Sequence, residues 1–263
     1  MNEKHEKIEV FGSTIFTKQI TQKVPNTNAP TLVFLHEGLG SVELWRDFPQ
    51  QLCEATGLEG FLYDRRGYGK SSPLLGEQGP DYLNVEAWDI LPAILSTVGI
   101  KNVILVGHSD GGTIALLYAS KFPGQVVGVI SEAAHVFIEE ATLRGVRNAQ
   151  LSYELTGLRS RLARYHGEKT QDMFKSWSRT WLSEDFKNWN IEQHLSNIVC
   201  PVLAIQGVED HFGTERQLRS IVDRTGGRAE ELLIHGCAHT PHSQATENVL
   251  SAMQNFIKSV MDW

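Results

Sequence analysis

Short apolar runs alternate with longer amphipathic segments along most of this chain, and this alternation constrains its fold more than any other feature. The runs at 31–37, 59–64 and 102–109 are separated by stretches with helical spacing, and a fourth run follows at 126–134. Parallel strands require crossover connections, and a strand that is buried on both faces is apolar throughout. The pattern therefore predicts an α/β fold with a mostly parallel sheet flanked by helices.

The ends of the chain extend this sheet. Residues 7–20 have the pattern of an antiparallel hairpin at one edge, and the apolar runs resume at 201–210 and 229–236 before a last helix from Pro241. These segments bring the expected sheet to eight strands.

Between about 135 and 195 the alternation stops, and the chain becomes helical, charged and rich in tryptophan (Trp177, Trp181 and Trp189). Roughly 60 residues is long for an ordinary crossover. We therefore predict a core made of residues 1–134 and 195–263, with a helical cap inserted at 135–194. An ordinary pair of crossover helices is the alternative.

Composition limits the class of protein. A chain of 263 residues that is 41% hydrophobic can bury the core of one large domain. The net charge of −7, with no Lys- or Arg-rich run, argues against a nucleic-acid partner. The charged start of the chain and the lack of a long apolar run predict no signal peptide and no membrane span, and three scattered cysteines predict no disulfide framework. We expect a cytoplasmic protein; nothing here predicts its oligomeric state.

One motif, Gly107-His108-Ser109-Asp110-Gly111, stands between a strand-like run and a helical one. It fits G-x-S-x-G, in which a serine on a sharp strand-to-helix turn presents its hydroxyl above the sheet. Flanking glycines let the strand and the helix approach closely, and the turn points the next backbone N–H at a reacting carbonyl. The context predicts that Ser109 is a nucleophile.

A serine nucleophile needs a base, and the base needs a partner that fixes its tautomer. Asp210 stands at the end of the run at 201–210, and His239 lies between the run at 229–236 and the last helix. A serine, an acid and a histidine in this order, with acid and base after late strands, match a known arrangement of such sites. The sequence predicts Ser109 as nucleophile, His239 as base and Asp210 as the acid.

Other residues are alternatives for these roles. Glu209 and Glu132 both follow apolar runs and are alternative acids. Among the histidines, His235 is expected within its strand, His242 in the first turn of the last helix, and His211 too close to Asp210 to face it.

Metal and nucleotide sites are less well supported. His235, Cys237, His239 and His242 form a cluster in the sequence but lack a ligand spacing typical of zinc. "GLGSVE" imitates a dinucleotide-binding turn with Glu43 at the third glycine, and "GYGKSS" imitates a phosphate loop whose first glycine would be Asp64. We predict neither a metal nor a cofactor.

Taken together, these motifs resemble the α/β-hydrolase fold family over essentially the whole chain. Residues 63–73 match the family's D-x-R-G-x-G-x-S turn, and residues 34–41 stand where the family carries its oxyanion loop. Glu37 stands where the family usually has glycine. The S-D-G-G string, the L-G-S of the oxyanion loop and the R-G-Y-G turn are similar to those of valacyclovir-hydrolase-like members, and the chain also resembles carboxylesterase-like members of the family.

The resemblance implies an oxyanion hole formed by the backbone N–H groups of Gly38 and Asp110. It implies a serine hydrolase that cleaves a small-molecule ester through an acyl-enzyme, with an amino-acid ester as one candidate. Similar triads serve C–C bond hydrolases, lyases and thioesterases, and a ligand-binding receptor with negligible turnover is a further alternative. Candidate residues of the substrate pocket are Glu37, Leu39, His108, Trp177 and Trp181.

The carboxylate of Asp110 has two interpretations. An acid in the first turn of a helix interacts favourably with the helix dipole, by about 0.3–1 kcal/mol. Alternatively, Asp110 and Glu37 place negative charge in the pocket and select a substrate that carries an ammonium group.

Overall fold

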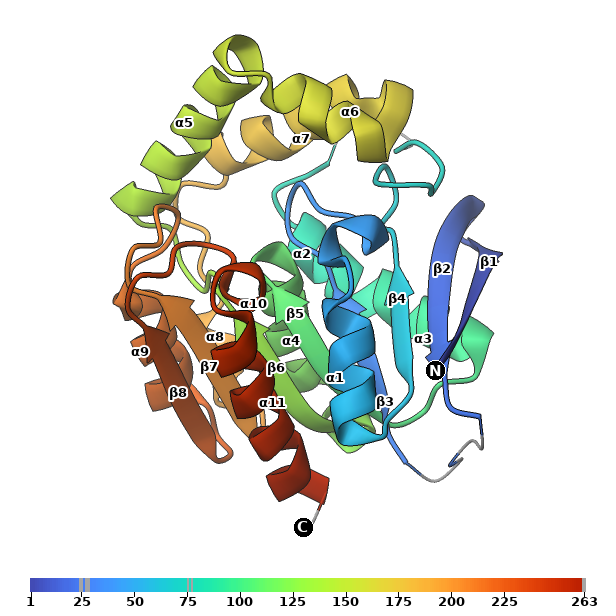
Figure 1. Ribbon diagram of the computed structural model, residues 1–263. Coiled ribbons are helices and arrows are strands. Elements are labelled where there is room, and N and C mark those ends of the chain that lie inside the picture. Colours follow the sequence, from blue (N-terminus) through green and yellow to red (C-terminus); the bar gives the residue numbers. More distant parts are fainter. Residues whose placement is uncertain (24–25, 27–28, 75, 77, 262–263) are drawn as a thin grey trace.

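In the computed structural model, eight strands form a single sheet in the order β1-β2-β4-β3-β5-β6-β7-β8 (Figure 1). The structure describes residues 1–23, 26, 29–74, 76 and 78–261. From β4 to β8 neighbouring strands are parallel, whereas β1 and β2 form an antiparallel hairpin at one edge. The predicted sheet and its edge hairpin are confirmed. The strands are β1 (Asn2–Val10), β2 (Ser13–Thr21), β3 (Thr31–Leu35), β4 (Gly60–Tyr63), β5 (Val103–His108), β6 (Val126–Glu132), β7 (Val202–Gly207) and β8 (Ala229–Ile234).

Helices cover both faces of the sheet. In β5, Val103 and Leu105 join a core that includes side chains of α3, α4 and α9, while Ile104 and Val106 join a second core with α1 and α11. This alternation follows from the two-residue period of a strand. None of the helices in the described ranges is long and apolar enough to cross a membrane. The helices are α1 (Phe48–Thr56), α2 (Tyr82–Val85), α3 (Leu91–Val98), α4 (Asp110–Lys121), α5 (Glu140–Leu155), α6 (Leu158–His166), α7 (Thr170–Leu182), α8 (Glu192–Leu195), α9 (Glu215–Arg224), α10 (Pro241–Gln244) and α11 (Thr246–Met261).

Helices α5, α6 and α7 form a separate layer above one edge of the sheet (Figure 1). The two ends of this segment meet, because Phe137 pairs with Asn190 in an isolated antiparallel bridge. Beside that bridge, the N–H of Ile191 donates to the carbonyl of Val136 at 2.8 Å. The layer coincides with the segment in which the sequence predicted a cap, and its role as a cap stays a prediction.

Three local predictions differ from the structure. The stretch of helical spacing between the apolar runs at 31–37 and 59–64 is not one helix but a 3-10 turn at Val42–Trp45 followed by α1, because the backbone at Arg46 has a φ of +51° and breaks the helix. The last helix is divided into α10 and α11. His235 lies just beyond β8, in the turn, and not within the strand.

The turn between β5 and α4 is strained and tightly packed. Ser109 adopts φ +53° and ψ −116°, a conformation that non-glycine residues rarely take. A side chain added at Gly111, two residues later, would overlap the carbonyl of Leu35 in β3. The glycine lets the first turn of α4 lie against β3, and this contact fixes the height of Ser109 above the sheet.

We expect Gly111→Ala to destabilise the protein, although alanine normally favours a helix. The added methyl group meets backbone that cannot move aside, so overpacking should lower the free energy of unfolding by about 1–3 kcal/mol. Gly124→Ala is the matched control, since its methyl group would have no atom within 4 Å. Urea denaturation measures both, and a Gly111→Ala protein as stable as the control would contradict this account.

Candidate active site

Ser109, His239 and Asp210 lie far apart in the sequence, but their side chains form one hydrogen-bonded series. The Oγ of Ser109 lies 2.9 Å from Nε2 of His239, and Nδ1 of the same ring lies 2.8 Å from Oδ2 of Asp210. They follow β5, β8 and β7 respectively, so the carboxyl ends of three parallel strands, with β6 between β5 and β7, bring them together at one edge of the sheet. The geometry is suited to transfer of the Ser109 hydroxyl proton to His239.

Asp210 is held by several donors. Its Oδ2 accepts from the amide of Gln206 at 2.6 Å, and its Oδ1 accepts from the backbone N–H of Phe212 at 2.8 Å. Burial alone would raise the pKa of Asp210, but the charge of His239 and the hydrogen bonds from His239 and the Phe212 N–H lower it. The carboxylate is therefore fixed and ionised beside the imidazole.

The ionisation of His239 is set by opposing effects. Burial of the ring acts to lower its pKa, whereas the negative charge of Asp210 and the hydrogen bond to it act to raise it. The interaction with Asp210 outweighs burial, and the pKa of His239 is raised above its usual value. The charge of Asp210 thus favours the protonated form of the His239 ring.

Glu132 and His242, alternatives to Asp210 and His239 in the sequence, are paired with each other. Both carboxylate oxygens of Glu132 lie 2.9 Å from Nδ1 of His242, and Oε1 also accepts from the His242 backbone N–H at 2.6 Å. Both side chains are buried. Because His242 follows His239 by three residues, this pair anchors the loop that carries His239.

The remaining alternatives lie elsewhere. The carboxylate of Glu209 accepts from the backbone N–H of Cys237, and His235 is exposed in the turn after β8. His108 donates from Nε2 to the carbonyl of His239 at 2.6 Å, and burial lowers its pKa to about 3. Among the described residues, no group of three or more His, Cys, Asp or Glu side chains is arranged to hold a metal ion.

The carboxylate of Asp110 is buried in a network that the sequence analysis missed. Its Oδ2 accepts from the Tyr82 hydroxyl at 2.8 Å and from the Arg65 guanidinium at 3.3 and 3.4 Å. Trp181 in turn donates from its indole Nε1 to the Tyr82 oxygen at 2.9 Å. The sequence contained one sign of this network, because Arg65 lies inside the R-R-G-Y-G turn. It did not show which carboxylate the Arg65 guanidinium would contact.

Glu37 shapes the loop after β3. Its carboxylate accepts from the N–H of Leu39 at 2.8 Å, and its backbone carbonyl accepts from Arg65 at 2.9 Å and from the N–H of Gly40 at 3.0 Å. Burial raises the pKa of the Glu37 carboxyl. The acid that stands in place of the family's usual glycine therefore closes the turn around Gly38.

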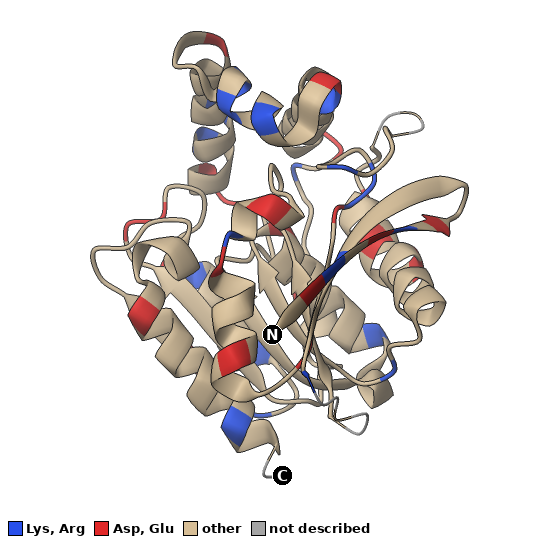
Figure 2. Cartoon of the chain, turned by 45° about the vertical axis from the view of Figure 1, so that its right-hand side comes forward, with Lys and Arg blue, Asp and Glu red and all other residues tan. Residues whose placement is uncertain are grey.

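A cavity of about 400 Å³ opens beside Ser109. Every candidate pocket residue from the sequence contributes to its wall: Glu37, Leu39, His108, Trp177 and Trp181. Further apolar residues of the wall that the sequence analysis did not identify are Val146, Ala149, Leu158 and Phe212. The layer above the sheet, which carries basic residues in Figure 2, also contributes Arg161 of α6.

Comparisons with known proteins place this geometry in context. The family model described as the alpha/beta hydrolase fold matches residues 30–199. The human serine hydrolase BPHL is 29% identical over 157 residues, which cover 56% of this chain and 52% of the relative. The chain thus spans about half the length of that relative. The mouse serine hydrolase BPHL is 25% identical over 205 residues, covering 74% of this chain and 68% of the relative.

A solved structure shares the fold over the whole chain. The serine hydrolase CCSP0084 from the polyaromatic-hydrocarbon-degrading bacterium Cycloclasticus zankles aligns with a TM-score of 0.80 at 15% identity, and the alignment covers all of both chains. At this identity the likeness concerns the fold alone.

We expect Asp210→Asn to lower the pKa of His239, because the substitution removes the neighbouring negative charge and keeps the side-chain shape. A neighbouring opposite charge shifts a pKa by roughly one to three pH units, and a fall of that order should be measurable from the imidazole Cε1–H chemical shift during an NMR titration. Glu209→Gln serves as the control, since Glu209 bonds Cys237 instead. An unchanged His239 pKa in Asp210→Asn would contradict the assignment of Asp210 as its partner.

Proposed function

The chain belongs to the α/β hydrolase fold family, and from this premise we propose that it is a serine hydrolase that cleaves small-molecule esters through an acyl-enzyme. The observation that carries the proposal is the placement of His239 within hydrogen-bond distance of both Ser109 and Asp210. The BPHL relatives, which are named serine hydrolases, support the same activity.

In the proposed reaction, Ser109 Oγ attacks the ester carbonyl carbon while its proton passes to His239 Nε2. The tetrahedral intermediate then breaks the bond to the alcohol oxygen, which leaves with the proton from His239. A water molecule repeats the sequence on the acyl-enzyme: it loses a proton to His239, attacks the carbonyl, and releases the acid as Ser109 regains its proton. Each half-reaction, acylation and deacylation, returns the charge of His239 to its starting state.

We assign stabilisation of the oxyanion to the backbone N–H groups of Gly38 and Asp110. Both residues line the cavity beside Ser109, and Asp110 is the first residue of α4, where backbone N–H groups have no partner within the helix. One such donor contributes about 2.7–4 kcal/mol to comparable reactions. We also propose that residues 135–194 act as a cap, because α5, α6 and α7 contribute to the cavity wall.

The contacts of Asp110 support a structural role for its carboxylate. Arg65, which is 2% exposed, supplies the opposing positive charge, and Tyr82 bonds the same oxygen. An ammonium group on the substrate would compete with this existing pair. Together with the apolar residues in the cavity wall, this pairing favours an ester whose acyl part carries no positive charge.

We expect Ser109→Ala to lower kcat/KM for a p-nitrophenyl ester by roughly four orders of magnitude or more, because the nucleophile is lost. The control is Ser120→Ala, which makes the same change on the outer part of α4 and should keep full activity. Thermal unfolding of both variants checks that they fold. A folded Ser109→Ala protein with wild-type activity would refute the proposal.

The role of Asp110 is tested by comparing the benzyl esters of L-alanine and propionic acid, which differ in one amino group. We expect the ratio of their kcat/KM values to change less than about threefold in Asp110→Asn, since Arg65 already neutralises the carboxylate. A preference for the alanine ester that falls tenfold or more in this variant, about 1.4 kcal/mol, would instead assign Asp110 to ammonium recognition.

A further inference from the structure

The indole N–H of Trp177 is a buried donor with nothing to bind in the described protein. Trp177 lies on α7 and is 5% exposed, and its Nε1 has no hydrogen-bond partner among the described residues. Trp181, one turn further along the helix, donates to Tyr82. An indole N–H can only donate, and leaving such a group unpaired in the interior costs free energy. An acceptor that arrives with a ligand would remove this cost.

The unpaired N–H lies next to the backbone of Gly38, at the wall of the cavity that contains the candidate site. Trp177 lines the cavity that contains Ser109 and His239, and a side chain built at Gly38 would overlap the indole Nε1. The absence of a side chain at Gly38 thus makes room for the indole. The donor therefore lies directly beside the loop to which we assign one half of the oxyanion hole.

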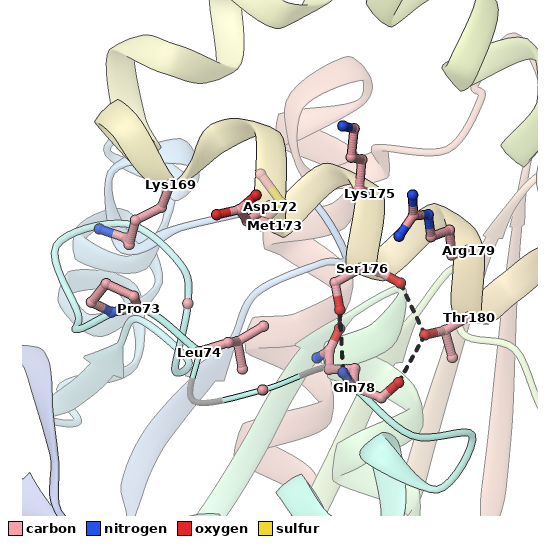
Figure 3. Close-up of a pocket in the computed structure, with 12 residues that line it drawn as sticks. Pro73, Leu74, Gln78, Lys169, Asp172, Met173, Lys175, Ser176, Arg179 and Thr180 are labelled. Atoms are coloured by element: carbon pink, nitrogen blue, oxygen red, sulfur yellow. Dashed lines mark hydrogen bonds between the residues drawn. The ribbon is translucent and has the colours of Figure 1, made fainter.

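The helix that carries Trp177 is fixed from its other face. Ser176 and Thr180 bond Gln78 in the segment after β4, as Figure 3 shows: Ser176 Oγ donates to the Gln78 side-chain oxygen at 3.3 Å, and Thr180 Oγ1 donates to its backbone carbonyl at 3.4 Å. A separate cavity of about 260 Å³ lies on this side of α7. These contacts hold the indole in place before any ligand binds.

Two more buried polar atoms of the cavity wall are also unpaired, Oγ1 of Thr142 and Nδ1 of His135. His135 directs Nε2 at the carbonyl of Phe212, 3.0 Å away, so Nε2 carries the proton and Nδ1 is left as an acceptor. Burial lowers the pKa of this ring, which keeps it neutral. Unpaired polar atoms from three segments of the chain indicate a cavity adapted to a ligand with polar substituents.

We propose that Trp177 Nε1–H donates a hydrogen bond to an oxygen on the carbon next to the scissile carbonyl, so that the substrates are small esters of 2-alkoxy, 2-hydroxy or 2-oxo acids. Such an oxygen can lie on the same side as the carbonyl oxygen, where a donor beside Gly38 reaches it. The identity of these substrates rests on the proposed ester hydrolysis, but the binding of the oxygen by Trp177 does not require turnover.

Ethyl methoxyacetate and ethyl butyrate test this directly, because they have the same length and differ in an ether oxygen in place of a methylene. We would titrate each into ¹⁵N-labelled Ser109→Ala protein and follow the assigned indole N–H signals by NMR. The Trp177 proton signal should move downfield with ethyl methoxyacetate and much less with ethyl butyrate, while the indole signal of Trp189, which lies away from this cavity, serves as the internal control. Equal responses to the two esters, or none, would overturn the inference.

Kinetics of the intact enzyme provide the second measurement. Trp177→Phe should lower the kcat/KM ratio of ethyl methoxyacetate to ethyl butyrate about three- to tenfold, the worth of one hydrogen bond. The intrinsic reactivities of the esters cancel in this comparison. Trp189→Phe, which removes another unpaired indole N–H away from this cavity, should leave the ratio unchanged.

The outcomes separate the two proposals. An equal fall for both esters in Trp177→Phe would contradict recognition of the ether oxygen. Hydrolysis of neither ester by the wild-type protein would count against the proposed function, and the NMR titration would still decide the role of Trp177.

Discussion

The strained backbone at Ser109 is the constraint on which the rest of the candidate site depends. A φ of +53° costs about 1–3 kcal/mol, and it persists because the turn is held on both sides. The Ser109 N–H donates to the backbone carbonyl of Glu132, and the N–H of Thr113 donates to the Ser109 carbonyl. The side chain of Glu132 binds His242 and so anchors the loop of His239. One residue at the end of β6 thus connects the serine turn to the histidine loop.

Buried charge around the site is divided among separate pairs. Asp210 faces His239, Glu132 faces His242, and Asp110 faces Arg65. Each carboxylate would be costly to bury alone, and each is stabilised by its own partner. The consequence is that Asp110 can supply its backbone N–H at the start of α4 while its negative charge is balanced by Arg65. In the proposed reaction, this pairing would let an acid follow the serine without placing an unopposed charge beside the developing oxyanion.

Much of this arrangement was predictable from the sequence, for physical reasons. The continuous apolar runs of the strands and their helical crossovers fix the sheet, and parallel strands bring Ser109, Asp210 and His239 to one edge. The break at Arg46 was not predictable, because a positive φ there leaves no local signal in a helical pattern. Pairings such as Asp110 with Arg65 and Glu132 with His242 were missed because they depend on side-chain packing between distant segments. The unpaired Trp177 N–H is likewise a property of the folded cavity.

The most direct test of the account is to treat the protein with a fluorophosphonate and locate the adduct by mass spectrometry of the intact chain and its peptides. Attack by an activated serine on phosphorus displaces fluoride and leaves one stable phosphonyl group. The account predicts a single adduct on Ser109, absent from Ser109→Ala and formed far more slowly in His239→Ala. A folded wild-type protein that forms no adduct, or carries it on another residue, would contradict the assignment of Ser109 as a nucleophile activated by His239.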